Sequence, residues 1–127
     1  MSERRQVSSG SPYEDQIGFS RAVRVGPHVA VSGTAPVMPD GAPVPADVYS
    51  QTRRCLEIVA AALAQAGAGL EHVVRTRIYA VRREDFHEIG RAHAEFFGET
   101  GPASTYVVVG LLDSRWAVEI EADAIVA

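Results

Sequence analysis

The chain has 127 residues, of which 46% are hydrophobic and 22% are charged, so it fits one globular domain over residues 1–127 and its composition argues against extensive disorder. The net charge of −4 argues against nonspecific nucleic-acid binding, which depends on a broad positive field, and against binding to anionic membrane surfaces. Because there is one cysteine and no apolar run near the ~20 residues that cross a bilayer, we expect a cytoplasmic protein without disulfides, membrane spans or nucleic-acid partners.

The first third of the chain is predicted to hold an arm, two strands and a loop. Residues 1–15 are polar and rich in Ser, Gly and charge, which predicts a flexible N-terminal arm. Phe19, Arg21, Val23 and Val25 alternate with Ser20, Ala22 and Arg24. A short apolar run follows at 29–32 after the Gly26-Pro27 turn, so two strands with a tight connection fit best. Four prolines between residues 33 and 45 then predict a loop.

Two helices are predicted where apolar residues recur three and four positions apart. Asp47 is placed to cap the first helix, whose stripe contains Val48, Thr52, Cys55, Val59, Leu63 and Ala66. Glu84 and Asp85 suit the positive end of the second helix, whose stripe contains Phe86, Ile89, His93 and Phe96 or Phe97.

Three further strands are predicted, over residues 73–81 and, at the end of the chain, over 103–109 and 117–126. The predicted order is therefore β-β-α-β-α-β-β. This order favours an α/β (α+β) fold in which a mixed sheet carries both helices on one face.

The last strand is expected to have one charged face. Glu119, Glu121 and Asp123 alternate with apolar residues, and Arg75 and Arg77 alternate similarly on the strand at 73–81. A solvated face explains this pattern, and so do charges that pair across a subunit interface or line a pocket. Buried charges would need partners, because an unpaired buried charge is costly.

Several kinds of chemical site have no support in the sequence. Cys55 lies on the apolar helix stripe, which indicates a buried structural thiol rather than a nucleophile. The four histidines show no paired metal-ligand spacing, and there is no phosphate-binding glycine loop or nucleophile elbow. We therefore expect neither a metal nor an organic cofactor.

Six short phrases, in order from about residue 19 to the C-terminus, resemble the Rid superfamily, also called the RidA or YjgF type. They are Phe19-Ser20-Arg21-Ala22, Val31-Ser32-Gly33-Thr34-Ala35-Pro36, Val44-Pro45-Ala46-Asp47, Ala94-Glu95-Phe96-Phe97, Gly101-Pro102-Ala103-Ser104-Thr105 and Val118-Glu119-Ile120-Glu121-Ala122. The resemblance implies a chorismate-mutase-like fold and a homotrimer with clefts between adjacent subunits. It also implies hydrolysis of reactive imines and enamines to a 2-keto acid and ammonia without a cofactor, although some members lack this activity and ribonuclease activity has been ascribed to others.

The resemblance places four residues in such a cleft. Phe19 occupies the position of an aromatic pocket residue, and Gly33 and Thr34 occupy the turn whose backbone groups bind the ligand. Glu119 matches an acidic residue that positions or activates water. An interface ion pair or a surface charge is the other interpretation of Glu119.

One position departs from the family pattern. Deaminating members carry an arginine that clamps the substrate carboxylate where this chain has Ser104, and Tyr106 stands where a small residue or cysteine is common. Serine cannot replace a bidentate guanidinium–carboxylate pair, so standard 2-aminoacrylate deamination is expected to be weak or absent. Arg77 could supply a clamp from another strand, or it could pair with the acids of the last strand.

The resemblance therefore implies a homotrimer that binds a small carbonyl, imine or enamine compound between subunits and hydrolyses or tautomerises it. Glu119 would act as acid or base, and Ser104, Tyr106 and the Gly33-Thr34 backbone would bind the ligand oxygen. The rival hypotheses are a non-catalytic ligand-binding or regulatory trimer and, against the acidic balance, a ribonuclease.

Overall fold

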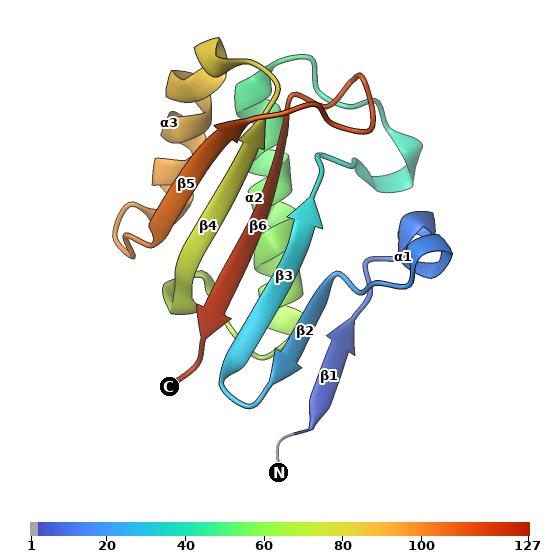
Figure 1. The fold of residues 1–127 in the computed structure, drawn as a ribbon, viewed down its shortest axis with the longest axis vertical. Helices are drawn as coiled ribbons and strands as arrows, with labels where there is room; N and C mark the ends of the chain where they lie inside the picture. The colour runs from blue at the N-terminus through green and yellow to red at the C-terminus, as the bar shows by residue number, and fades with distance from the viewer. Residues whose placement is uncertain (1–2) are drawn as a thin grey trace.

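Six strands form one mixed sheet in the computed structural model, which describes residues 3–127. The strands are β1 (Arg4–Val7), β2 (Ala22–Val25), β3 (His28–Thr34), β4 (Val73–Ala80), β5 (Ala103–Val108) and β6 (Val118–Ile125). They lie in the order β1-β2-β3-β6-β4-β5 (Figure 1). Neighbouring strands are antiparallel except for β4 and β5, which are parallel.

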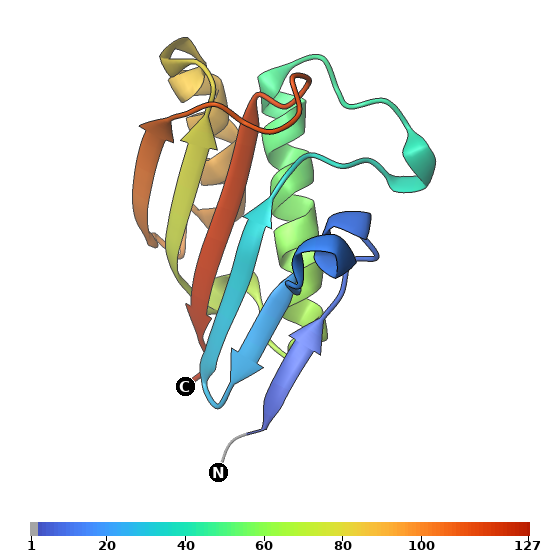
Figure 2. The same ribbon diagram turned by 45° about the vertical axis from the view of Figure 1, so that its right-hand side comes forward.

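Two long helices cover one face of this sheet. These are α2 (Val48–Gln65) and α3 (Phe86–Phe97), and both lie behind the strands in Figures 1 and 2. The third helix, α1 (Pro12–Ile17), is short and lies beside the β1 and β2 side of the sheet. Because α3 connects the parallel strands β4 and β5, it forms the crossover that a parallel pair requires. The predicted mixed sheet with two helices on one face is confirmed.

The buried core joins the helix stripes to the inward face of the sheet. Alternate residues of β6, from Val118 to Ala124, are buried, and the predicted α2 stripe contributes Thr52, Cys55, Val59, Leu63 and Ala66. The Asp47 carboxylate caps α2 by accepting a hydrogen bond from the Ser50 backbone nitrogen at 2.9 Å, as predicted. Within residues 3–127, no helix is long and apolar enough to cross a membrane.

The second helix differs slightly from its prediction. Residues Arg83–Asp85 form a 3-10 turn, so α3 begins at Phe86 rather than at the two acids. Phe86 is 53% exposed because it lies at the helix start beyond the core, whereas Ile89 and Phe97 are buried.

The N-terminal segment corrects the prediction of a loose arm over residues 1–15. Residues 4–7 form β1, which pairs antiparallel with β2, and Ser11 caps α1 by accepting a hydrogen bond from the Tyr13 backbone nitrogen. Strand pairing and helix capping use backbone groups that a polar sequence also supplies, so composition alone could not reveal them. Residues 1–2, the start of the expected arm, lie outside the described residues.

Cys55 has the environment that its helix stripe predicts. The side chain is fully buried, with Sγ 3.8 Å from the Val118 carbonyl oxygen. Burial raises the pKa of the thiol strongly, so the reactive thiolate is disfavoured.

Replacing Leu63 by alanine tests the α2–sheet packing. Leu63 is fully buried in α2, so Leu63→Ala should lower the free energy of unfolding by about 2–5 kcal/mol through lost burial and a residual cavity. Leu112→Ala is the matched control, because Leu112 is 91% exposed. Denaturant unfolding at one protein concentration measures both, and equal effects would contradict this packing.

Candidate functional site

The Glu119 carboxylate lies against the backbone of Gly33 on the sheet face that the long helices leave open. Its neighbours Val118 and Ile120 are buried toward the helices, so alternation along β6 turns Glu119 to the other side. A Cβ atom on Gly33 would lie 3.4 Å from Cδ of Glu119 and would collide with its Oε2. Glycine at position 33 therefore makes room for the carboxylate.

An irregularity in strand pairing accompanies this contact. Val31 pairs with Ala122 and Thr34 pairs with Ile120, so β3 has one residue more than β6 in this interval. Such a bulge bends its strand locally and redirects side chains. The bulge contains Ser32 and Gly33, and the Gly33 backbone lies beside Glu119.

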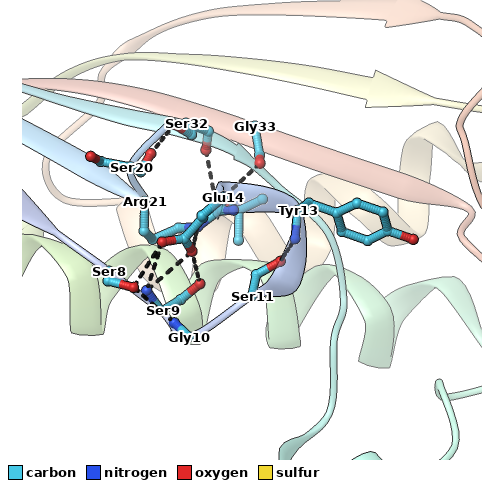
Figure 3. A network of polar contacts seen from close by, with 11 residues as sticks. Ser8, Ser9, Gly10, Ser11, Tyr13, Glu14, Ser20, Arg21, Ser32 and Gly33 are labelled. Atoms are coloured by element: carbon cyan, nitrogen blue, oxygen red, sulfur yellow. Dashed lines mark hydrogen bonds and ion pairs between the residues drawn. The ribbon is translucent and has the colours of Figure 1, made fainter. Parts of the chain in front are cut away.

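Arg21 is buried and forms hydrogen bonds with the bulge of β3 at Gly33 and Thr34, referred to below as the Gly33 turn. Its Nη1 donates hydrogen bonds to the Gly33 carbonyl oxygen at 2.6 Å and to Thr34 Oγ1 at 3.2 Å. The side chain is only 7% exposed, and its guanidinium carbon lies 5.4 Å from the ring centre of Phe19. Figure 3 shows Arg21 between the Gly33 turn and the N-terminal segment. Arg21 thus links three of the predicted site residues.

Glu14 of α1 lies on the other side of Arg21 (Figure 3). Its carboxylate is 5% exposed and accepts hydrogen bonds from Ser8 Oγ at 2.9 Å, from the Ser9 backbone nitrogen at 3.1 Å and from the Ser9 hydroxyl. Burial alone would raise the pKa of Glu14, but the hydrogen bonds from Ser9 and Ser8 outweigh burial and lower it. An ionised Glu14 therefore faces Arg21, with 3.9 Å between Oε2 and Nε.

The two carboxylates near Arg21 differ in their electrostatics. Burial raises the pKa of Glu119, and Glu121 adds to this effect, while Arg21 opposes it. Among the described residues, no group hydrogen-bonds the buried Nε of Arg21. A carboxyl group with raised proton affinity beside a fixed cation is suited to exchange a proton with a ligand or a water molecule.

Arg77 pairs with the acids of β6. Its Nη1 lies 3.1 Å from Asp123 Oδ2 and 3.9 Å from Glu121 Oε1. The Tyr79 hydroxyl also donates a hydrogen bond to Glu121. The structure thus has the ion pairing that the sequence left open, and these charges on the open face satisfy one another within one chain.

Ser104 and Tyr106 lie apart from Glu119. They belong to the edge strand β5 and pair in register with Thr76 and Ile78, whose side chains are buried toward the helices. The Tyr106 hydroxyl donates to the Arg82 carbonyl oxygen at 3.1 Å. Phe19, Gly33, Thr34 and Glu119 therefore come together in one chain, but Ser104 and Tyr106 are on the opposite side of the sheet.

Sequence reasoning did not identify Arg21 and Glu14 as site residues. Arg21 lies in one of the phrases that resemble the Rid superfamily, but nothing in the phrase indicates that its side chain reaches Gly33. Glu14 lies in a segment predicted to be loose. Within residues 3–127, no three His, Cys, Asp or Glu side chains are grouped to hold a metal ion.

Comparison with known proteins decides the family. Residues 13–126 match the family model described as Endoribonuclease L-PSP. The chain belongs to the Endoribonuclease L-PSP family. This L-PSP family chain is 45% identical to Rv2704 of Mycobacterium tuberculosis, a member of the YjgF/YER057c/UK114 family, with a TM-score of 0.90 and coverage of 98% of this chain and 100% of that one. The resemblance to the Rid superfamily is therefore confirmed.

The names of two further relatives of the L-PSP family chain state an activity or a bound small molecule. The 2-iminobutanoate/2-iminopropanoate deaminase of Escherichia coli is 34% identical over 110 residues, which cover 84% of this chain and 86% of that one. The crystal structure of Escherichia coli TdcF with bound serine is 29% identical, with a TM-score of 0.81 and coverage of 97% of this chain and 94% of that one.

Adding a methyl group at residue 33 tests the Glu119 contact. Gly33→Ala should push the carboxylate toward solvent, so the pKa of Glu119 should fall toward its ordinary value as the burial effect weakens. Gly110→Ala is the control, because a Cβ there meets nothing within 4 Å. Carboxyl ¹³C NMR titration measures the pKa, and an unchanged value in Gly33→Ala would contradict the assigned contact.

The raised pKa of Glu119 also predicts how stability depends on pH. Above the ordinary glutamate pKa the unfolded chain ionises first, so burying Glu119 costs folding free energy, whereas well below it both states carry the proton. Glu119→Gln should therefore be more stable than the parent protein at pH 7, and the difference should vanish near pH 3. Thermal unfolding across pH measures this difference, with the exposed Glu99→Gln as control. A stability difference between Glu119→Gln and the parent that does not change with pH would contradict burial of Glu119 as its cause.

Proposed function

We propose that clefts between copies of this chain bind a small carbonyl, imine or enamine compound, and that Glu119 hydrolyses or tautomerises it as acid and base. One observation carries the proposal: a half-buried carboxylate of raised pKa lies at a glycine bulge beside a buried arginine. Membership of a family whose relatives include a named imine deaminase supports the same chemistry.

The placement of the site residues supports a cleft that needs more than one copy. In one chain, Glu119 faces the open side of the sheet while Ser104 and Tyr106 face the helix side of an edge strand. A neighbouring copy that packs on the open face would bring its β5 edge to Glu119. The open face also carries exposed apolar side chains that a neighbour would cover, namely Val25, Val74, Val107 and Ile125.

The proposed reaction adds water to a carbon–nitrogen double bond. Ionised Glu119 takes a proton from water as the water oxygen bonds to the imine carbon, and it gives this proton to the imine nitrogen, which yields a carbinolamine. Glu119 then takes the proton of the carbinolamine hydroxyl and delivers it to the nitrogen as the carbon–nitrogen bond breaks, which gives a ketone and ammonia. For an enamine, the same carboxyl group first moves a proton to carbon. The backbone at Gly33 and Thr34, beside Phe19, would hold the ligand near this group.

Ser104 separates this proposal from the reaction of the deaminating relatives. A serine hydroxyl is neutral, so it does not neutralise a substrate carboxylate as a guanidinium does. We therefore propose a ligand other than a simple 2-imino acid. Ribonuclease activity, which the family description names, has no support in the net charge of −4.

An imine competition assay tests the proposal. An amino-acid oxidase generates imines from several amino acids, semicarbazide traps them, and hydrolysis by the protein lowers the trapped yield. We expect slow competition for 2-iminopropanoate and faster competition with Ser104→Arg, because arginine restores the carboxylate clamp. Glu119→Gln should lower the turnover of any hydrolysed imine about 10²–10⁴-fold, the usual contribution of general acid–base catalysis.

Two outcomes would contradict the proposed function. Fast 2-iminopropanoate hydrolysis by the parent protein would overturn the role of Ser104. Unchanged turnover in Glu119→Gln would remove the carboxylate from the chemistry. Ligand binding that survives Glu119→Gln without turnover in the parent would instead favour a binding trimer, and sedimentation velocity of both proteins would show whether the copies still associate.

A further inference from the structure

Three side chains form a hydrogen-bonded series, called here the hydrogen-bond chain, that ends at Ser104. The His93 Nε2 atom of α3 lies 2.9 Å from Thr76 Oγ1 on β4, and Thr76 Oγ1 donates to Ser104 Oγ on β5 at 2.8 Å. Thr76 is fully buried and His93 half-buried, whereas Ser104 is exposed at the edge of the sheet. The chain therefore runs from beneath α3 to the surface of the strand that the proposed cleft would use.

A threonine hydroxyl has one hydrogen, so Thr76 can donate it at only one of its two contacts. When Thr76 donates to Ser104, Thr76 accepts at its contact with His93, and the imidazole carries its hydrogen on Nε2. Ser104 accepts from Thr76, and its own hydrogen remains free for another partner.

The surroundings of His93 suit a fixed donor. Its ring lies 4.8 Å from that of Phe97, centre to centre, and burial lowers the pKa of His93. A neutral imidazole has one N–H group, which the chain uses. Successive hydrogen bonds polarise one another in a region of low dielectric constant, and this strengthens the donor at the end of the chain.

We infer that His93 and Thr76 are positioning residues that make the Ser104 hydroxyl a hydrogen-bond donor for a neutral carbonyl oxygen of the ligand. This inference rests on the proposed function and narrows its substrate class. A single neutral donor suits a ketone, ester or amide oxygen, whereas a carboxylate favours a charged, bidentate partner.

Tyr106, two residues after Ser104 on β5, adds an apolar surface beside the Ser104 hydroxyl. The Tyr106 hydroxyl is engaged by the Arg82 carbonyl oxygen, and the Tyr106 ring packs edge-to-face on Phe86, with 5.1 Å between ring centres. Beside the Ser104 donor, the strand therefore presents aromatic surface. The substrate class is a small neutral carbonyl or imine compound with an apolar substituent.

The histidine tautomer gives a test that needs no ligand. ¹⁵N NMR of histidine-labelled protein distinguishes Nε2–H from Nδ1–H, and His93→Gln identifies the resonances of His93. We expect the Nε2–H tautomer of His93 at neutral pH in the parent, and a change in its Nε2 signal in Thr76→Val, which removes the acceptor. An Nδ1–H tautomer of His93 in the parent protein would reverse the donor-to-acceptor direction of these hydrogen bonds and overturn the inference.

Binding of two probes tests the ligand class. Calorimetry should show that methyl pyruvate, which is neutral, binds more tightly than pyruvate, which is anionic. Thr76→Val should weaken methyl pyruvate binding about two- to tenfold, the worth of one hydrogen bond, while Thr76→Ser keeps the hydroxyl and should bind like the parent.

The outcomes separate this inference from the proposed function. If the parent binds methyl pyruvate and Thr76→Val binds it equally well, the positioning role is overturned while the proposed function stands. Preference for pyruvate in the parent would overturn the neutral ligand class. If the parent binds neither probe and hydrolyses neither the 2-imino acids of the competition assay nor the imine of methyl pyruvate, the proposed function fails, and this inference fails with it.

Discussion

The close approach of a carboxylate to a backbone without a Cβ atom organises the candidate site. Glu119 occupies the space that a side chain at residue 33 would fill, and the bulge in β3 creates this space between two otherwise regular strands. Arg21 then holds the same turn through the Gly33 carbonyl oxygen. The contact with Gly33 thus sets the position of the carboxylate, and burial there raises its pKa while Arg21 opposes this rise.

The alternation of the central strands divides the chemistry between two faces. On β6, apolar residues face the helices while Glu119, Glu121 and Asp123 face the open side, where Arg77 and Tyr79 of β4 provide partners. On β5, Ser104 faces the helix side. One chain cannot join Glu119 to Ser104, so the proposed activity and the association of copies depend on each other.

Local patterns in the sequence predicted most of the fold. The apolar stripe of α2, the cap at Asp47 and the alternation of β4 and β6 are repeated in the structure because each depends on residues close in sequence. The N-terminal strand and α1 were not predicted, because backbone pairing and a serine cap give little compositional signal. Similarly, the contacts of Arg21 with Gly33 and of His93 with Thr76 join residues 12 and 17 positions apart, where no periodicity connects them.

The two edges of the sheet differ in how readily they would accept another strand. The outer strand β1 is four residues long and begins with Arg4 and Arg5, whereas β5 contains no charged residue over Ala103–Val108. Charge on a short edge strand discourages an incoming backbone, and an uncharged edge accepts one more readily. The molecule therefore has one sheet edge that resists strand addition and one that lacks this protection, and this difference disfavours unlimited side-by-side growth of the sheet.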